Sequence, residues 1–263
     1  MILSPIEQSI KRKIEAAGVP LKDWDISINY GIKTGYNDAF IISGAKRAEI
    51  LAGCKTEEER KRTDELIRPV LRGRDIRRYG YEFADLYLIA TFPSRHYNIE
   101  EYPAVKKHLL SFGIERLEQS GKEYIVNGEK IKARKKTNNK WFETQDSISY
   151  WDDFFKPKIF YADITQKLNF CYCEEVMFCN NTTYFMTSNS TDILPKIQHY
   201  LNSKLIDWYY RTLSVQLGEK AVRLFSIYVL KIPLPKSLDN DIYKAFNLTE
   251  KEIEFIENYF ISL

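Results

Sequence analysis

The sequence has no run of apolar residues near the roughly 18 that a membrane span needs, which excludes a transmembrane helix. Its first thirteen residues place Lys11, Arg12 and Lys13 after the apolar positions, the reverse of a secretory signal. We therefore expect a cytoplasmic protein without a membrane partner. Its four cysteines should then stay reduced, because the cytosol keeps thiols out of disulfides.

Residues for common catalytic sites are also scarce. The three histidines share no spacing that would build a site, and no glycine-rich cofactor loop follows a predicted strand. Cys171 and Cys173 lack a Cys-x-x-Cys spacing and a neighbouring histidine, which argues against zinc. Glu59 and Lys61 match a nuclease element only within a charged helical stretch. The sequence therefore predicts no catalytic, metal or cofactor residue, although a nuclease with an unrecognised metal site stays open as the alternative.

What the chain does contain is enough apolar surface for a folded core. Its 263 residues are 44% hydrophobic and include 18 Tyr, 15 Phe and four Trp. Disordered chains lack aromatic surface of this kind, so the chain should fold. The length corresponds to one large domain or two small ones.

Charge is distributed unevenly along the chain. The net charge is +3, but residues 237–263 hold two cations against six anions, which leaves +7 on the rest. Residues 68–78 hold five arginines against Asp75 alone, and residues 121–140 hold seven cations against two glutamates. Two concentrated basic stretches suggest a polyanionic partner, with a solvated basic surface as the plain alternative.

Hydrophobic periodicity predicts a mixture of helices and strands. The predicted strands are 24–30, 39–42, 87–92, 159–164, 169–173, 183–187 and 224–232, and the predicted helices are 6–17, 56–71, 99–117, 192–212 and 249–261. The first two strands should form a hairpin through 31–38, and 121–139 should form a second hairpin or an excursion with Asn127-Gly128 at its turn. Because helices and strands do not alternate regularly, we predict an α+β fold of mixed small sheets with flanking amphipathic helices.

Several short motifs follow one another in order between residues 24 and 236. They are Gly31-Ile32-Lys33-Thr34-Gly35, Asn37-Asp38-Ala39-Phe40-Ile41-Ile42, Arg68-Pro69-Val70-Leu71-Arg72-Gly73-Arg74-Asp75-Ile76-Arg77-Arg78-Tyr79, Trp141-Phe142-Glu143, Lys156-Pro157-Lys158-Ile159, Asn180-Asn181-Thr182-Thr183-Tyr184-Phe185, Leu201-Asn202-Ser203-Lys204-Leu205 and Ile232-Pro233-Leu234-Pro235-Lys236. In this order and spacing the region resembles the C-terminal specificity domain of TaqI-like, type IIG restriction-modification enzymes. In that family this is the target recognition domain, which reads DNA sequence for an attached adenine methyltransferase and often a nuclease.

The resemblance implies an organisation and a set of partners. Residues 1–23 would be a lead-in helix, 24–236 the DNA target recognition domain, and 237–263 an acidic C-terminal helix. The partners would be double-stranded DNA and a methyltransferase, with or without a nuclease, in the same or a companion chain. S-adenosylmethionine and magnesium are expected only in those attached domains, since no Asn-Pro-Pro-Tyr type motif occurs here. A third possibility is an interaction scaffold that docks through the acidic helix.

Three groups of residues are the candidate DNA contacts. Between Gly31 and Gly35, whose backbone can approach a ligand closely, Lys33 and Thr34 could contact a phosphate, unless the segment is only a strained turn. Guanidinium forks suit phosphates or guanine edges, unless some pair with Asp75 or a helix end; the four in question are Arg72, Arg74, Arg77 and Arg78.

The third group is the lysine-rich run that ends at Trp141. Its cations suit phosphates and its amides suit adenine, with a solvated flexible loop as the alternative. The residues are Lys130, Lys132, Arg134, Lys135, Lys136, Asn138, Asn139 and Lys140. Within these groups we assign backbone gripping to residues such as Arg74 and base reading to Asn139.

Overall fold

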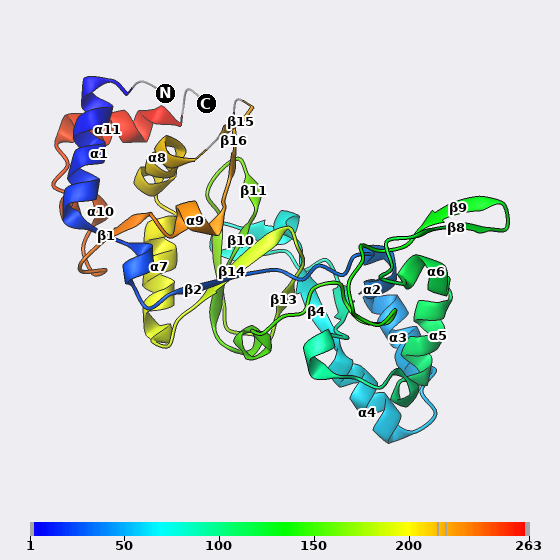
Figure 1. The fold of residues 1–263 in the computed structure, drawn as a ribbon. Helices are drawn as coiled ribbons and strands as arrows, with labels where there is room; N and C mark the ends of the chain where they lie inside the picture. The colour runs from blue at the N-terminus through cyan, green and yellow to red at the C-terminus, as the bar shows by residue number, and fades with distance from the viewer. Residues whose placement is uncertain (1–2, 215, 219, 261–263) are drawn as a thin grey trace.

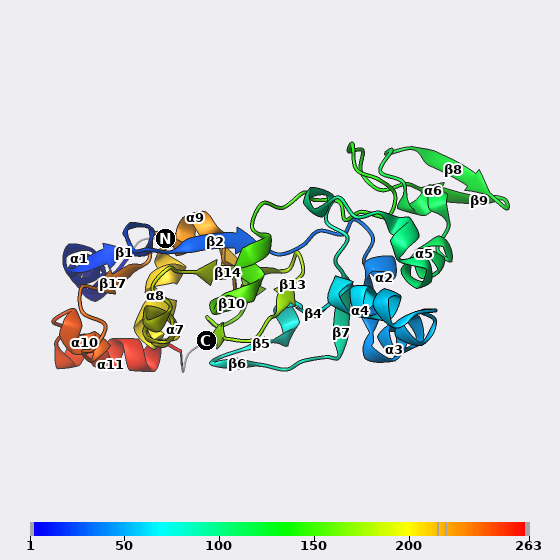
Figure 2. The same ribbon diagram turned by 90° about the horizontal axis from the view of Figure 1, so that it is seen from below.

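The protein is an elongated molecule of several small sheets and flanking helices. The structure, a computed structural model, describes residues 3–214, 216–218 and 220–260. Helices α1 (Pro5–Ala17) and α11 (Glu250–Tyr259) lie at one end, and the hairpin of β8 (Glu123–Val126) and β9 (Glu129–Lys132) projects from the other (Figures 1 and 2). This mixed arrangement confirms the predicted α+β class. No helix in the described part of the chain is long and apolar enough to cross a membrane.

Two four-stranded sheets form the framework. One is antiparallel and has the order β12 (Phe170–Cys173), β10 (Lys158–Ala162), β14 (Thr183–Thr187), β2 (Ser27–Tyr30). The other is mixed and has the order β13 (Phe178–Cys179), β4 (Ile67–Leu71), β7 (Leu86–Ile89), β3 (Ile41–Ser43). The smaller sheets are β11 (Ile164–Thr165), β16 (Ala221–Arg223) and β15 (Gln216–Leu217), the pair β1 (Gly18–Pro20) and β17 (Pro233–Pro235), the pair β5 (Ile76–Arg77) and β6 (Gly80–Tyr81), and β8 with β9.

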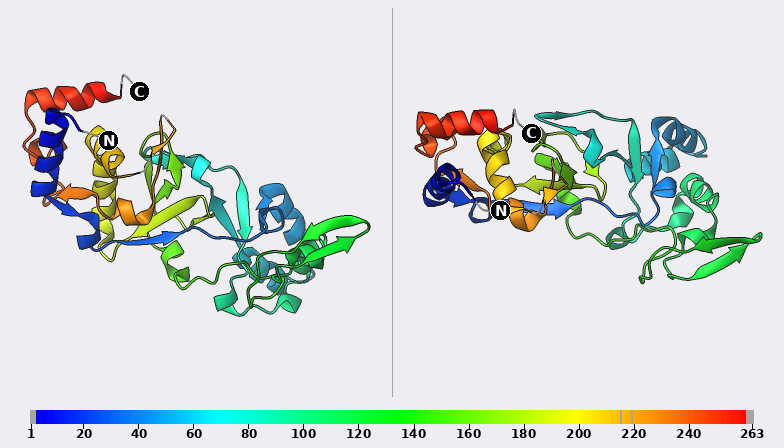
Figure 3. Two further views of the ribbon diagram at one scale, coloured as in Figure 1. Left: turned by 45° about the horizontal axis from the view of Figure 1, so that its top comes forward. Right: turned by 90° about the horizontal axis from the view of Figure 1, so that it is seen from above.

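Helices cover these sheets in two groups, which Figure 3 shows from two further sides. Beside the second sheet lie α2 (Asn37–Phe40), α3 (Gly44–Ala52), α4 (Glu57–Leu66), α5 (Pro103–Leu110) and α6 (Ile114–Leu117). Beside the first sheet and toward the termini lie α1, α7 (Leu194–Leu201), α8 (Lys204–Leu213), α9 (Ser226–Val229), α10 (Ile242–Ala245) and α11. We call these two groups with their sheets the hairpin-side lobe and the terminal lobe.

The first sheet, of β12, β10, β14 and β2, packs against the cores of both lobes, because successive side chains of a strand point to opposite faces. On β10, Phe160 packs into the core of the hairpin-side lobe, while Ile159 and Tyr161 pack into the core of the terminal lobe. On β14, Phe185 packs into the core of the hairpin-side lobe and Met186 packs into the core of the terminal lobe. The sheet is therefore shared by two cores, which ties the lobes together.

The predicted hairpin of residues 24–30 and 39–42 is wrong. Strand β2 pairs with β14, whereas β3 pairs with β7 in the other sheet, and α2 occupies 37–40. After β2, the backbone of Ile32 pairs with Asn180 and its N–H donates to the carbonyl of Cys179 at 2.8 Å. This pairing carries the chain from one sheet to the other, so the glycine-rich segment is a crossing and not a turn.

Other helices and strands differ from their predicted bounds for local reasons. The helix predicted for 56–71 ends at Leu66, where β4 begins, and the helix predicted for 192–212 breaks into α7 and α8. At that break the Ser203 hydroxyl accepts the N–H of Ile206 at 3.2 Å and so begins a new helix. The strand predicted for 224–232 is wrong, because 226–229 form α9. Strand β17 begins only after this range, and its prolines are tolerated because it pairs only with β1.

The N-terminal and C-terminal helices form one core with α8. Ile10 and Ile14 of α1 pack with Trp208 of α8 and Ile256 of α11. The division into 1–23, 24–236 and 237–263 stays a prediction, and the packing shows that both ends contact the middle segment.

A buried carboxylate links α1 to α11. Glu252 accepts hydrogen bonds from Lys13 Nζ at 2.7 Å, Ser9 Oγ at 2.8 Å and the Thr249 backbone N–H at 2.7 Å. Burial alone would raise the pKa of Glu252, but these hydrogen bonds outweigh it and lower the pKa from 4.5 to about 2.

We expect the stabilisation from Glu252 to be present above about pH 4.5, where the unfolded-state carboxylate is also ionised, and to be lost as the pH falls toward 2. The Glu252→Gln variant should therefore unfold more easily than wild type at pH 7, and the gap should close below pH 3. Urea denaturation at several pH values measures this, with the exposed Glu254→Gln as the matched control. A gap that does not change with pH would contradict the expectation.

Candidate nucleic-acid interface

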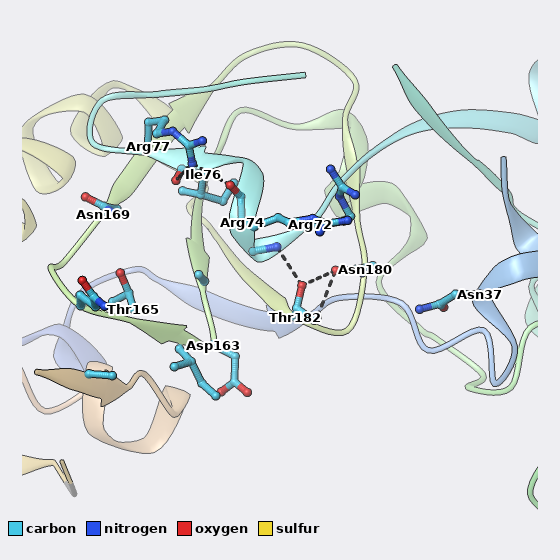
Figure 4. Close-up of a pocket in the computed structure, with 15 residues that line it drawn as sticks. Asn37, Arg72, Arg74, Ile76, Arg77, Asp163, Thr165, Asn169, Asn180 and Thr182 are labelled. Carbon is cyan, nitrogen blue, oxygen red and sulfur yellow. Dashed lines mark hydrogen bonds between the residues drawn. The ribbon is translucent and has the colours of Figure 1, made fainter. Parts of the chain in front are cut away.

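A cleft of about 970 Å³ lies where the two lobes meet (Figure 4). One wall is the segment 72–77, which runs through the 3₁₀ turn η2 (Gly73–Asp75) into β5. The opposite side is formed by 162–166 at the junction of β10 and β11, together with Ala221. Asn37, Asn169, Asn180 and Thr182 complete the lining. The cleft thus gathers three of the motifs that stand far apart in the sequence.

The η2 turn is positioned by close backbone packing. The Gly73 N–H donates to Thr182 Oγ1 at 2.8 Å, and a Cβ on Gly73 would stand 2.5 Å from the Thr182 carbonyl oxygen. Only glycine fits this approach. The Thr182 hydroxyl in turn donates to Asn180 Oδ1 at 2.6 Å, so the motif around 180–182 fixes the arginine-bearing turn.

The Arg72 side chain is held in an ion pair with Asp75 of the same turn. Its Nε and Nη2 donate to the two carboxylate oxygens of Asp75 at 2.9 and 2.7 Å, and its backbone N–H donates to Asp75 Oδ2 at 2.8 Å. Burial alone would raise the pKa of Asp75, but the hydrogen bonds from Arg72 outweigh it and lower that pKa. The alternative role of pairing with Asp75 therefore describes Arg72 better than a free DNA contact does.

The other three candidate arginines, Arg74, Arg77 and Arg78, are exposed but differ in their hydrogen-bond partners. Arg77 donates to Glu82 and to the Arg74 carbonyl, both at 2.6 Å, and Arg78 donates to the Asn202 carbonyl. The Arg74 side chain points along the cleft wall and makes no hydrogen bond or ion pair with any residue the structure describes (Figure 4). Arg74 is thus the arginine most available for a ligand.

A second, smaller hollow of about 250 Å³ adjoins the cleft and shares Asn37 with it. Lys33 lines it and is exposed, with its ammonium 5.4 Å from the centre of the Tyr30 ring. Thr34 is buried, and its hydroxyl donates to Asn37 Oδ1 at 2.7 Å while accepting the Tyr36 N–H. The predicted phosphate role thus suits Lys33, whereas the Thr34 hydroxyl shapes the loop.

Both glycines of this loop are required by packing within the protein. A Cβ on Gly31 would stand 1.9 Å from the Asn180 carbonyl oxygen. Gly35 has a φ of +79°, and a Cβ there would stand 2.6 Å from Gln145 Oε1. The close approach predicted for these glycines is therefore made to the chain itself.

Arg134 of the lysine-rich run is buried, with 4% of its surface exposed. Its guanidinium donates to the carbonyls of Leu117, Thr34, Glu143 and Trp141 at 2.6–2.8 Å. Burial lowers the pKa of Arg134 to about 10, and the nearby Glu143 carboxylate opposes this. The sequence pattern predicted a DNA contact for Arg134, but its role is structural instead, since every one of these bonds points into the protein.

The other residues of the lysine-rich run are exposed, except Asn139, which is half-buried. Lys130 pairs with Glu123 at 2.7 Å, and no ion pair to a described residue is made by Lys132, Lys135, Lys136 or Lys140. Asn139 is half-buried, and its amide nitrogen donates to the Gln145 carbonyl at 2.8 Å. Asn138 is exposed. Base reading is therefore better suited to Asn138 than to Asn139, whose amide holds the loop.

The sequence prediction missed the amide and hydroxyl groups that line the two hollows. Asn37, Gln145 and Asn180 to Thr182 belong to them. Asn37 and Asn180–Thr182 lie in the quoted motifs, but only the fold shows that the motifs meet.

No group of three His, Cys, Asp or Glu side chains in residues 3–214, 216–218 and 220–260 could hold a metal ion. Cys171, Cys173 and Cys179 are buried in β12 and β13, and burial raises the pKa of Cys171 to about 12. What the two hollows offer is cations, amides and hydroxyls, beside apolar side chains such as Ile76 and Ile164.

Comparison with known proteins defines the class. The model of the TaqI-like C-terminal specificity domain matches residues 68–234. This chain belongs to that family of specificity domains, which are modules for recognising DNA sequence. No curated protein matches.

Solved structures include similar folds at low sequence identity. The type IIG restriction endonuclease BpuSI matches with a TM-score of 0.51 and 11% identity, over 97% of this chain. The type IIL restriction-modification enzyme MmeI, solved in complex with DNA, matches with a TM-score of 0.44 and 13% identity, over 92% of this chain. The chain spans 28% of the length of each of these enzymes.

Proposed function

We propose that this chain reads a specific double-stranded DNA sequence through the inter-lobe cleft and the hollow beside it, and directs an attached adenine-N6 methyltransferase to that site. The observation that carries the proposal is the convergence of three separated motifs on the cleft, where the Arg74 side chain has no hydrogen-bonded partner in the described structure. S-adenosylmethionine and magnesium would then act in the attached catalytic domains, in the cytoplasm, where DNA is methylated.

The surface provides the two kinds of group that sequence-specific binding needs. Phosphate oxygens would be met by exposed cations that make no ion pair with a described residue, namely Lys33, Arg74, Lys132, Lys135, Lys136 and Lys140. Base edges would be met by amides, which pair with adenine in a bidentate manner. Asn37 is the best placed amide because it lines both hollows and is exposed. Its Oδ1 accepts the Thr34 hydroxyl with one of two lone pairs, and its Nδ2 donates to no described residue, which leaves both atoms able to meet a base.

Selection of bound duplexes from a random double-stranded pool tests the proposal and yields a consensus sequence. Arg74→Ala should then weaken binding to the consensus and to a scrambled duplex by the same factor, because phosphate contacts are blind to sequence. Asn37→Ala should weaken only consensus binding, by about 1 to 3 kcal/mol, because it removes a base contact. Equilibrium titration of both duplexes measures this.

Lys22→Ala is the matched control for Arg74, because Lys22 is an exposed cation in the 3₁₀ turn Leu21–Asp23, directly after β1, and lines neither hollow. It should change neither affinity, and thermal melting should show that all three variants are folded. If Arg74→Ala removes the preference for the consensus while Asn37→Ala leaves it intact, the two roles are reversed.

A further inference from the structure

The β8–β9 hairpin is a two-stranded ribbon that pairs with no other described strand and projects from the end of the molecule (Figures 1 and 2). Its turn residues, Asn127 and Gly128, have φ angles of +51° and +84°. Two consecutive positive φ angles define the tight turn whose twist matches paired strands. The hairpin is therefore a tightly turned, twisted ribbon with which no other described strand pairs.

The two faces of this ribbon have opposite characters. Tyr124, Val126 and Ile131 point to one face and are half-buried, and the exposed Glu129 lies beside them near the turn. The other face carries Glu123, Ile125, Lys130 and Lys132, all exposed. Strand alternation would place polar residues alone on such a face. Ile125 breaks this pattern and is 81% exposed, more than any other large apolar residue in the described structure.

The ribbon is continuous with the proposed DNA surface. Strand β9 leads directly to Arg134, whose Nη1 donates to the Thr34 carbonyl at 2.6 Å, in the loop that forms the smaller hollow. That hollow shares Asn37 with the cleft. Lys135 and Lys136 are exposed just beyond this anchor. A polyanion that follows these cations from the cleft would reach the exposed face of the hairpin.

We propose that the β8–β9 hairpin enters the major groove of duplex DNA and places Ile125 against the C5 methyl group of a thymine. This rests on the proposed function. The major groove is about 12 Å wide and admits a two-stranded β-ribbon, and the thymine methyl is its apolar feature. Ile125 has no hydrogen-bonding group and stands directly opposite Lys130, beside Lys132 on the same face. The two lysines would meet the phosphates at the groove edges, with Lys130 exchanging Glu123 for a phosphate.

The test removes the methyl group from the DNA and the side chain from the protein. The 263-residue chain is titrated with the consensus duplex and with a series of duplexes. In each duplex of the series, one thymine of the consensus or its flanks is replaced by deoxyuridine. Wild type should lose roughly threefold to fivefold in affinity at one thymine, the effect of one buried methyl group. Ile125→Ala should bind the thymine duplex more weakly and should no longer distinguish thymine from uracil at that position.

Ile227→Ala is the matched control, because Ile227 is 62% exposed on α9 in the other lobe. It should bind like wild type and keep the thymine preference. If wild type binds the consensus but Ile125→Ala keeps the same preference at every thymine, the hairpin assignment is overturned and the proposed function stands. If wild type binds no duplex at all, the proposed function fails, and the hairpin assignment fails with it.

Discussion

The Arg134→Ala variant should lose about 3 to 5 kcal/mol of unfolding free energy, a large share of the stability of an ordinary domain. Arg134 is buried and supplies hydrogen bonds to four backbone carbonyls, those of Leu117, Thr34, Glu143 and Trp141. Removing the guanidinium leaves these carbonyls without that partner, and each buried unsatisfied group costs about 1 to 3 kcal/mol. Water entering the vacated space would recover part of that cost. Urea denaturation followed by circular dichroism measures the loss.

The neighbouring Lys135→Ala variant is the matched control, because Lys135 is exposed and makes no ion pair with a described residue. Its stability should stay within about 0.5 kcal/mol of wild type. Arg134→Lys should also be destabilised, since an ammonium group cannot span four carbonyls that a planar guanidinium reaches. If Arg134→Ala were as stable as wild type but bound DNA more weakly, Arg134 would be a surface contact, as the sequence had predicted.

DNA binding should depend steeply on salt. Each phosphate neutralised contributes about −0.9 to the slope of log affinity against log salt concentration. If each of the six exposed cations that make no ion pair with a described residue neutralises one phosphate, the slope is about −5. Affinity should then fall by roughly 10³ between about 50 and 200 mM salt. Fluorescence anisotropy of a labelled duplex across that range measures the slope.

Two variants show which cations produce this slope. The double variant Lys135→Ala, Lys136→Ala should reduce its magnitude by about 2, because two phosphate contacts are lost. Lys22→Ala should leave it unchanged. A wild-type slope near zero would remove the electrostatic basis of the proposed interface.

Local chemistry made parts of this molecule predictable. The Asn127-Gly128 pair between short strands predicted the β8–β9 hairpin, and strand β14 has the bounds that its pattern indicated. Such elements depend on neighbours within a few residues, which a sequence displays directly. The family motifs were also visible, because order and spacing survive in the sequence.

Contacts between residues far apart in the sequence determine the features that local patterns did not predict. A glycine-rich stretch between two strand patterns favours a hairpin, yet Gly31 passes against Asn180, which lies far along the chain. Likewise, a run of lysines with one arginine is typical of an exposed surface. Arg134 is buried because four carbonyls converge on it, one of them from Thr34 a hundred positions earlier, and no local pattern marks that convergence. The sequence thus displays the residue types, while the surroundings of each side chain depend on the fold.

The most direct test of sequence-specific recognition is the ratio of dissociation constants for the consensus and scrambled duplexes, measured with the wild-type chain at physiological salt. Specific DNA-binding proteins prefer their own sites by about 10³ or more over non-specific DNA. We expect the selection to yield a single consensus and the ratio to reach about 10³. A selection without a consensus, or a ratio near one, would contradict the account.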